Sequence, residues 1–299
     1  MQKIIPSLWF DSEAEEAAQF YTSLFPGSKI DTVTHYGKAG FETHGQPEGT
    51  VMTVDFELAG FRMLGLNGGP LFKFTPAISL SVICDTEAET DALWQKLTEG
   101  GKVLMDLGKY DWNERYGWVA DKYGLSWQLT TAPVAEAGQK ITPSFLFVGE
   151  QYGRAEEAIN HYTSIFKDSR EGNLFKGEAG ASGQHEPLLY GDFYLQGARF
   201  AAMDGRGEHN FSFNEAVSLI VNCGSQEEVD YFWEKLTEGG EESHCGWLKD
   251  KFGVSWQITP IVLDQMMLDP DEAKVERVTN AFLQMRKLDI GELEEAFRG

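Results

Sequence analysis

Three segments of the chain occur twice, in the same order, and this repetition limits what the chain can fold into. The paired segments are identical at 14 of 25, eight of 13 and seven of 11 positions, over 77–101 with 216–240, 118–130 with 247–259, and 15–25 with 156–166. Chance does not explain three ordered matches, so the 299 residues contain a tandem duplication. We therefore expect two copies of one fold rather than two unrelated domains.

A short turn-forming segment separates the two copies. Pro133 and Gly138 interrupt any regular element there, as is typical of a linker. The predicted organisation is a first domain over 1–132, a linker over 133–140, a second domain over 141–263 and a helical tail over 264–299.

Each copy is predicted to contain the order strand, helix and three strands twice, which makes four βαβββ units in the chain. Ser12 with Glu15 predicts a capping box for the first helix, and Thr86 with Glu89 predicts one for the second, which ends at Gly100. Alternating apolar residues predict the strands of the first copy. They cover 6–10, 29–36, 51–58, 61–66, 78–84, 102–107, 117–120 and 125–130. The predicted fold class is α+β.

The tail after residue 263 has helical periodicity and no counterpart in the first copy. Asp269 and Glu272 are predicted to cap a helix with Pro270 at its first position, and a second short helix is predicted after Asp289. An apolar stripe that includes Val278 runs along the first of these helices. Since most apolar stripes serve packing, we expect a helical latch on the body of the protein.

The charge balance excludes several classes of partner. Lys and Arg number 25 against 47 Asp and Glu, a formal charge of −22, and the basic residues are scattered. Such a chain repels nucleic acid and anionic membranes. Three cysteines imply no disulfide framework, and no signal peptide or membrane-length apolar run is present, so we expect a cytoplasmic protein. A pseudo-dimeric monomer and a homodimer both remain open.

Three motifs together resemble the vicinal oxygen chelate superfamily, which includes glyoxalase I, bleomycin-resistance proteins and extradiol dioxygenases. They are Ala-Glu-Glu-Ala-x-x-x-Tyr from Ala14, Leu-Asn-Gly-Gly-Pro from Leu66, and Asp-Lys-(Tyr/Phe)-Gly-(Leu/Val)-Ser-Trp-Gln from Asp121 and again from Asp250. More narrowly they resemble the PhnB-like group, which carries the label 3-demethylubiquinone-9 3-methyltransferase. No glycine-rich loop after a strand, with an acidic residue on the next strand, indicates a Rossmann cofactor unit.

The resemblance implies paired units that curl into U-shaped sheets around two cavities. It also implies a divalent metal, held by His and Glu side chains on the first, fifth and eighth strands of a pair. Strand alternation predicts which side chains face the cavities. In the first copy these are Ser7, Trp9, Asp55, Ser79 and Gln128, and in the second they are Ser144, Asp192, Ser218 and Gln257.

The predicted ligand strands therefore present Ser, Ser and Gln in both copies. Neutral hydroxyl and amide groups are poor ligands for a divalent metal, and one aspartate in each cavity makes a weak site. The histidines do not pair by repeat position; they are His35, His44, His161, His185, His209 and His244. We expect no cofactor, and a metal-dependent lyase, isomerase or dioxygenase with relocated ligands is the alternative.

The two predicted cavities differ in their aromatic residues. Tyr110, Trp112 and Tyr116 are expected to cluster with Trp9 in the first copy, where 16 residues separate Gly101 from Trp118. Only six residues fill the matching interval of the second copy, and they include Cys245, which we place at the second cavity. Cavities of this kind suit a small organic molecule. We therefore expect a small-molecule binding protein whose two cavities bind different things, or of which one is structural.

Overall fold

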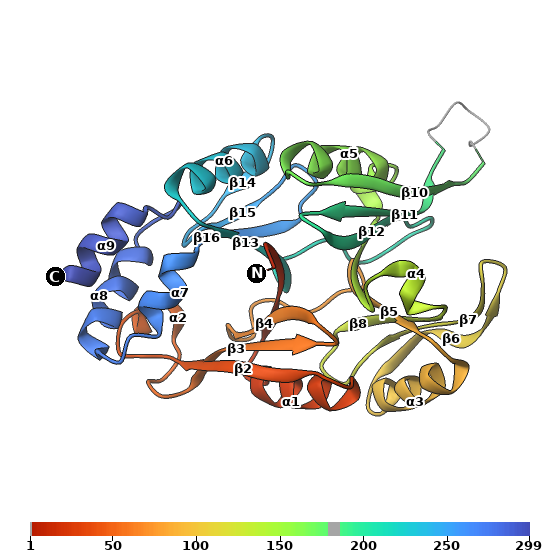
Figure 1. The fold of residues 1–299 in the computed structure, drawn as a ribbon, viewed down its shortest axis with the longest axis horizontal. Coiled ribbons are helices and arrows are strands. Elements are labelled where there is room, and N and C mark those ends of the chain that lie inside the picture. The colour runs from red at the N-terminus through yellow and green to blue at the C-terminus, as the bar shows by residue number, and fades with distance from the viewer. Residues whose placement is uncertain (1, 179–185) are drawn as a thin grey trace.

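The computed structural model describes residues 2–178 and 186–299 and confirms an α+β fold of four βαβββ units (Figure 1). The first unit contains β1 (Ile4–Phe10), α1 (Ala14–Leu24), β2 (Lys29–His35), α2 (Phe41–His44), β3 (Val51–Leu58) and β4 (Phe61–Asn67). The second contains β5 (Ile78–Cys84), α3 (Glu87–Thr98), β6 (Lys102–Tyr110), β7 (Asn113–Ala120) and β8 (Ser126–Thr131), and α4 (Val134–Ala137) follows in the linker.

The second copy repeats this order and then adds the helical tail. Its first unit contains β9 (Ile141–Phe147), a short 3-10 turn (Gly149–Gln151), α5 (Ala155–Ile165), β10 (Arg170–Lys176), β11 (Leu188–Leu195) and β12 (Ala198–Asp204). Its second unit contains β13 (Val217–Cys223), α6 (Gln226–Thr237), β14 (Glu241–Glu242), β15 (Trp247–Lys249) and β16 (Ser255–Pro260). The tail forms α7 (Ile261–Met267), α8 (Glu272–Phe282) and α9 (Ile290–Arg298).

Each eight-stranded sheet combines one unit from each copy, so the expected pairing of units within a copy is wrong. Sheet A has the order β14-β15-β16-β13-β1-β4-β3-β2, and sheet B has the order β10-β11-β12-β9-β5-β8-β7-β6. At their centres, β1 pairs antiparallel with β13 and β5 pairs antiparallel with β9. In Figure 1 the first copy forms the lower layer and the second the upper layer, while sheet A lies on the left and sheet B on the right. The sheets thus cut across the two proposed domains.

The repeat alone does not distinguish pairing of units within a copy from pairing between copies, because the first strands of all four units are similar. The two units of one copy lie in different sheets, and they contact each other through core side chains instead of strand hydrogen bonds. Tyr21 on α1 of sheet A donates a hydrogen bond to Asp121 in the β7–β8 turn of sheet B (2.7 Å), and Trp127 Nε1 donates to the same carboxylate (2.8 Å). Tyr162 and Trp256 repeat this geometry at Asp250 in the second copy.

The largest hydrophobic core is continuous through both sheets and lies between their strands and the helices α1, α3, α5 and α6. The alternation expected from sequence is confirmed there, since Leu80 and Val82 are buried in this core together with Trp127. Cys84 and Cys223 are buried at matched positions, and burial raises the pKa of the first thiol to about 11 and of the second to about 12. Both thiols therefore stay protonated at neutral pH and serve as packing groups.

The first helix is not capped by its own sequence, and the expected capping box of Ser12 and Glu15 is wrong. The amide of Ala14 instead donates to Oδ1 of Asn67 at the end of β4 (2.8 Å). Asp204 does the same for α5, where its Oδ1 accepts from the amide of Ala155 (3.2 Å). The box at Thr86 is confirmed, because its Oγ1 accepts from the amide of Glu89.

The tail forms a second, smaller core around Val278, Leu288 and Leu293. Its helix α8 begins after Asp271, two residues later than expected, because Asp271 rather than Asp269 accepts from the first amides of the helix. The predicted helix after Asp289 is confirmed. No helix among the described residues is long and apolar enough to cross a membrane.

Candidate functional site

Small polar side chains form the floor of the concave face of sheet B. Across its central strands, Ser79 on β5 lies opposite Ser144 on β9 and Ser126 on β8. Ser81 lies two residues further along β5 and opposite Gln128 on β8. The structure therefore brings Ser79, Gln128 and Ser144 together from both copies, and we refer to them with Ser81, Ser126 and Thr142 as the hydroxyl floor.

Most groups of the hydroxyl floor hydrogen-bond to one another or to an aromatic neighbour. Ser79 Oγ lies 2.8 Å from Ser126 Oγ, and Ser81 Oγ lies 2.7 Å from Ser144 Oγ. Trp118 Nε1 donates to Ser126 Oγ (2.7 Å). Thr142 Oγ1 is the exception, since it is buried and has no hydrogen-bond partner among the described residues. A buried hydroxyl without a partner costs free energy, which a ligand that hydrogen-bonds it would recover.

Aromatic side chains flank the floor on the β6–β7 side. Tyr110 and Trp112 stack with their ring centroids 4.9 Å apart, and Tyr116 packs edge-on against both. The Tyr116 hydroxyl donates to Gln128 Oε1 (2.8 Å). The segment expected to be an aromatic loop is thus a β-hairpin, because the strands extend to within two residues of each other. Trp112 at its tip is 64% exposed and is available to a ligand.

The expected cluster of Trp9 with these three residues is wrong. Trp9 lies on sheet A, where it packs edge-on against Phe72 (5.0 Å) and Trp247 (6.1 Å). Its Nε1 donates to the carbonyl of Gly69. A Cβ at Gly68 would lie 2.2 Å from the Trp9 ring, so this position requires glycine. Trp9 therefore belongs to the other concave face.

An ion pair stands at the other side of the hydroxyl floor. Asp192 Oδ2 accepts from Arg199 Nε (2.9 Å) and Nη2 (2.7 Å), and its Oδ1 accepts from the amide of Asn173 (2.6 Å). Arg199 Nη2 also donates to the Tyr190 hydroxyl. The sequence reasoning identified Asp192 but missed its partner. The available signal was an arginine seven residues after the aspartate in both copies.

The concave face of sheet A carries the matching residues. Gln257 Nε2 donates to Ser218 Oγ (2.9 Å), Ser7 lies opposite Ser218, and Asp55 forms an ion pair with Arg62. The helical tail lies at one border of this face, whose residues Trp9 and Gln257 stay partly exposed. Asp264 on α7 is an exposed residue near Arg62 and Asp55, and partial desolvation by its neighbours raises the pKa of its carboxyl group. In Figure 1, α7, α8 and α9 lie at the sheet A end of the molecule.

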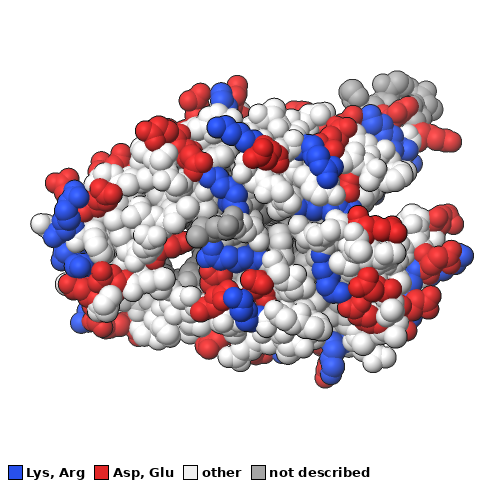
Figure 2. Space-filling model, viewed as in Figure 1, with Lys and Arg blue, Asp and Glu red and all other residues white. Residues whose placement is uncertain are grey.

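The tail also takes the place of the hairpin that the second copy lacks. The amide of Cys245 donates to the carbonyl of Met285 (2.8 Å), and the amide of Gly246 donates to that of Arg286 (2.7 Å). Cys245 therefore lies in the β14–β15 turn against the tail, with a positive φ of 57°. Sheet B contacts no terminal helices of this kind among the described residues, and Figure 2 shows a notch in the outline of the molecule at the sheet B end. The hydroxyl floor itself is buried beneath neighbouring side chains.

Neither floor suits a divalent metal. The side chains on the expected ligand strands are neutral, and each nearby aspartate already binds an arginine. Among the described residues, no three His, Cys, Asp or Glu side chains lie close enough to hold a metal ion. His185 lies outside the described residues, and His161 is half-buried on α5, where burial lowers its pKa.

Both copies of the repeat match the same known protein family. The sequence model of a family described as 3-demethylubiquinone-9 3-methyltransferase matches residues 2–130 and again 139–259. A solved structure described as a putative 3-demethylubiquinone-9 3-methyltransferase, PhnB protein, from Bacillus cereus is 44% identical. The match covers 44% of this chain and 100% of that chain, with a TM-score of 0.40.

A more distant likeness extends over both copies. Glyoxalase I from Zea mays is 10% identical over 84% of this chain and 89% of that chain, with a TM-score of 0.50, which is a likeness of fold alone. There is no significant match among curated proteins.

Proposed function

Because the chain belongs to the 3-demethylubiquinone-9 3-methyltransferase, or PhnB-like, family, we propose that its sheet B binds a small organic molecule without a divalent metal. The observation that carries the proposal is the hydroxyl floor, a set of buried polar side chains on the concave face of sheet B next to a half-exposed aromatic hairpin. Binding sites for small molecules typically combine apolar walls with a few fixed polar groups. Hydroxyl and amide groups can both donate and accept, so they suit neutral polar groups such as carbonyls.

The hydrogen bonds within the floor favour binding over nucleophilic catalysis. Its serines bond to each other and to Trp118, and none of them bonds to a described histidine or carboxylate. A serine needs such a base to become a nucleophile. The described residues therefore orient a ligand rather than attack it.

Matched variants of the two sheets test the proposal. Neutral aromatic fragments would be screened by thermal shift and by ligand-observed NMR against the wild-type protein, Gln128→Ala and Gln257→Ala. We expect fragments whose binding is lost with Gln128→Ala and kept with Gln257→Ala, because only sheet B has a packed aromatic hairpin beside its glutamine. Fragments that bind both variants equally would contradict the assignment to sheet B.

Metal analysis of the purified protein tests the other half of the proposal. We expect less than stoichiometric metal, and no change in Tm with EDTA or with added Ni, Mn, Zn or Co. Stoichiometric metal that raises the Tm would instead support a metal-dependent lyase, isomerase or dioxygenase with relocated ligands.

A further inference from the structure

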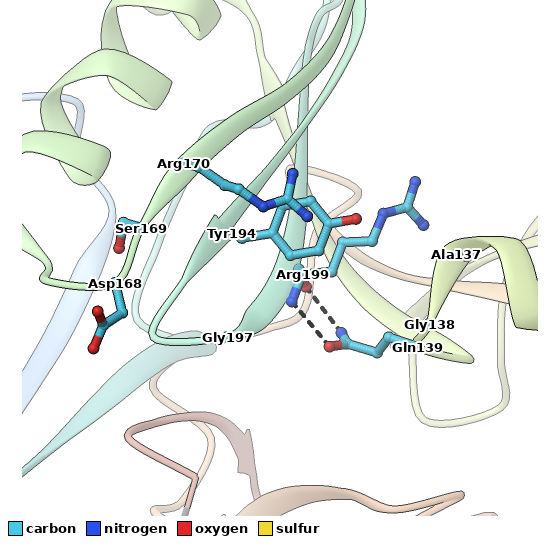
Figure 3. A pocket seen from close by; sticks show the side chains of 9 residues that line it. All are labelled: Ala137, Gly138, Gln139, Asp168, Ser169, Arg170, Tyr194, Gly197 and Arg199. Carbon is cyan, nitrogen blue, oxygen red and sulfur yellow. Dashed lines mark hydrogen bonds between the residues drawn. The ribbon is translucent and has the colours of Figure 1, made fainter.

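A pocket of about 540 Å³ lies beside the hydroxyl floor, between β10–β12 and the linker helix α4 (Figure 3). Three of its lining side chains are Arg170, Tyr194 and Arg199. The Arg170 guanidinium lies over the Tyr194 ring, 3.7 Å from its centroid. Figure 3 shows Arg199 next to this stack, and Asp168, which also lines the pocket, points away from the stack.

Comparison of the two copies shows that Arg170 has lost its internal partners. The matching residue of the first copy is Lys29, which forms an ion pair with Asp31 (2.8 Å) and lies opposite Glu57. In the second copy the residue opposite Arg170 is Tyr194, so a neutral ring replaces the carboxylate. Arg170 forms no ion pair with any described residue.

The position of Asp31 is taken by Gly172, two residues after Arg170. A Cβ at Gly172 would lie 2.1 Å from Asp192 Oδ1, so the carboxylate of Asp192 has moved into the space of a side chain. That carboxylate is committed to Arg199 and to the amide of Asn173. It therefore leaves the guanidinium of Arg170 unneutralised.

Arg199 offers a second hydrogen-bond donor to the pocket that contains the Arg170 guanidinium. Its Nε and Nη2 bind Asp192, while its Nη1 has no hydrogen-bond partner among the described residues. Because Ala201 pairs with Ser144 in a parallel ladder, Arg199 and Thr142 lie side by side two residues earlier on β12 and β9. The unpartnered Thr142 hydroxyl is thus the member of the hydroxyl floor that the strand register places next to Arg199.

We propose that this pocket binds the carboxylate of a small organic acid, whose body extends over Tyr194 towards the hydroxyl floor. The proposal rests on the proposed function, and it names the class of ligand. The planar guanidinium of Arg170 matches a carboxylate in shape and charge, and its stacking on Tyr194 fixes its plane. The volume lies within the range of sites for small molecules.

Binding of benzoate, with benzamide as its neutral counterpart, tests the proposal by NMR titration. We expect benzoate to bind more tightly than benzamide, and its Kd to rise with ionic strength. Arg170→Gln is expected to weaken benzoate roughly tenfold or more, the usual effect of losing one charged hydrogen bond, and to leave benzamide unchanged. Inorganic phosphate is the second arm, and binding of phosphate but not benzoate would overturn the assignment to a carboxylate.

Two further variants separate this proposal from loss of the fold. Tyr194→Glu restores the carboxylate that faces Lys29 in the first copy, so it should abolish the benzoate preference while Arg170 is still present. Lys29→Gln is the matched control and should change nothing. Equal benzoate affinity in the wild type and Arg170→Gln would overturn the inference. If neutral fragments still bound in a Gln128-dependent way in that case, the proposed function would stand without this inference. Conversely, an Arg170-dependent preference for benzoate without Gln128-dependent fragment binding would contradict the proposed function alone.

Discussion

The two concave faces of this protein share a frame of serines, a glutamine and an ion pair, and they differ at one position pair of the floor and at their borders. Ser7, Ser218, Ser255 and Gln257 of sheet A match Ser144, Ser79, Ser126 and Gln128 of sheet B, whereas Ile5 and Ile220 stand where sheet B has Thr142 and Ser81. Each face also has an aspartate paired with an arginine seven residues later. The C-terminal helices bind the short β14–β15 turn at the border of sheet A. At the same border sheet B has the long β6–β7 hairpin with three packed aromatic residues.

This difference shows that duplication preserved the scaffold while insertions at its edges changed what each face can do. The second copy is ten residues shorter between its matched Gly and Trp positions, and the tail fills the space. If the proposed function holds, we therefore expect one small-molecule site in each chain, although the repeat suggests two.

The largest expected effect compares the two ion pairs. Asp192→Ala leaves Arg199 buried without a counter-charge and leaves the amide of Asn173 without its acceptor, so we expect a loss of about 3–5 kcal/mol in the free energy of unfolding. Asp55→Ala should cost about 1 kcal/mol, because Arg62 is more exposed and Asp264 lies near it. Denaturation in urea measures both values, and equal losses would show that the two faces are energetically alike.

The next effect concerns the helical tail at the border of sheet A. Leu288 is 1% exposed in the tail core, so Leu288→Ala should destabilise the attachment of the tail by about 2–4 kcal/mol. Burial raises the pKa of the Cys245 thiol next to this segment, and release of the tail should lower that pKa and speed thiol labelling at pH 8. Cys84 and Cys223 should stay unlabelled. Leu268→Ala, at a tail leucine that is 56% exposed, is the control, and equal labelling rates in both variants would contradict protection of Cys245 by the tail.

A smaller effect tests the concave face of sheet B. Tyr116→Phe removes the hydroxyl that donates to Gln128 Oε1 and should cost about 1 kcal/mol. Fragments that bind the hydroxyl floor should bind this variant more weakly, since Gln128 is no longer held in place. Tyr110→Phe, whose hydroxyl binds only the carbonyl of Asp106 in its own hairpin, should leave fragment affinity unchanged. The reverse order of effects would place the ligand at the tip of the hairpin instead.

The repeat and the strand alternation were sufficient to predict the units of the fold and the faces of their strands. Alternation assigned Ser79 and Gln128 to the face opposite the buried Leu80 and Trp127, because alternation along a strand is a local property. The partner of each strand is not local. Whether β1 pairs with β5 or with β13 depends on contacts between segments that are distant in sequence. The two candidate partner strands have the same sequence pattern, so the pattern does not choose between them.

The same limit explains the errors in the site. Trp9 was grouped with Tyr110 because both lie in one copy, and the exchange of units places them on different sheets. The cap of α1 was assigned to Ser12 because capping rules use neighbours in sequence, whereas Asn67 reaches the helix from β4. Arg199 could have been found from the repeat, since the spacing from Asp to Arg is the same in both copies.

The smallest expected effect is a pH dependence of the protein's stability that arises from Asp264, next to sheet A. Partial desolvation raises the pKa of Asp264 above its ordinary 3.8, with Asp55 adding to the shift and Arg62 opposing it. Its charged form is therefore disfavoured in the folded state, and the stability it contributes is complete below pH 3.8 and is lost as the pH rises through the raised pKa. Asp264→Asn imitates the protonated form. Because Asp264 is exposed and solvent screens its charge, we expect this variant to stabilise the protein only slightly at pH 7 and to have no effect near pH 3. Glu276→Gln, at an exposed position on α8, should change neither value. If Asp264→Asn destabilised the protein at pH 7, its carboxylate would be a favourable partner of Arg62, and the tail would be held to sheet A by charge rather than by apolar packing.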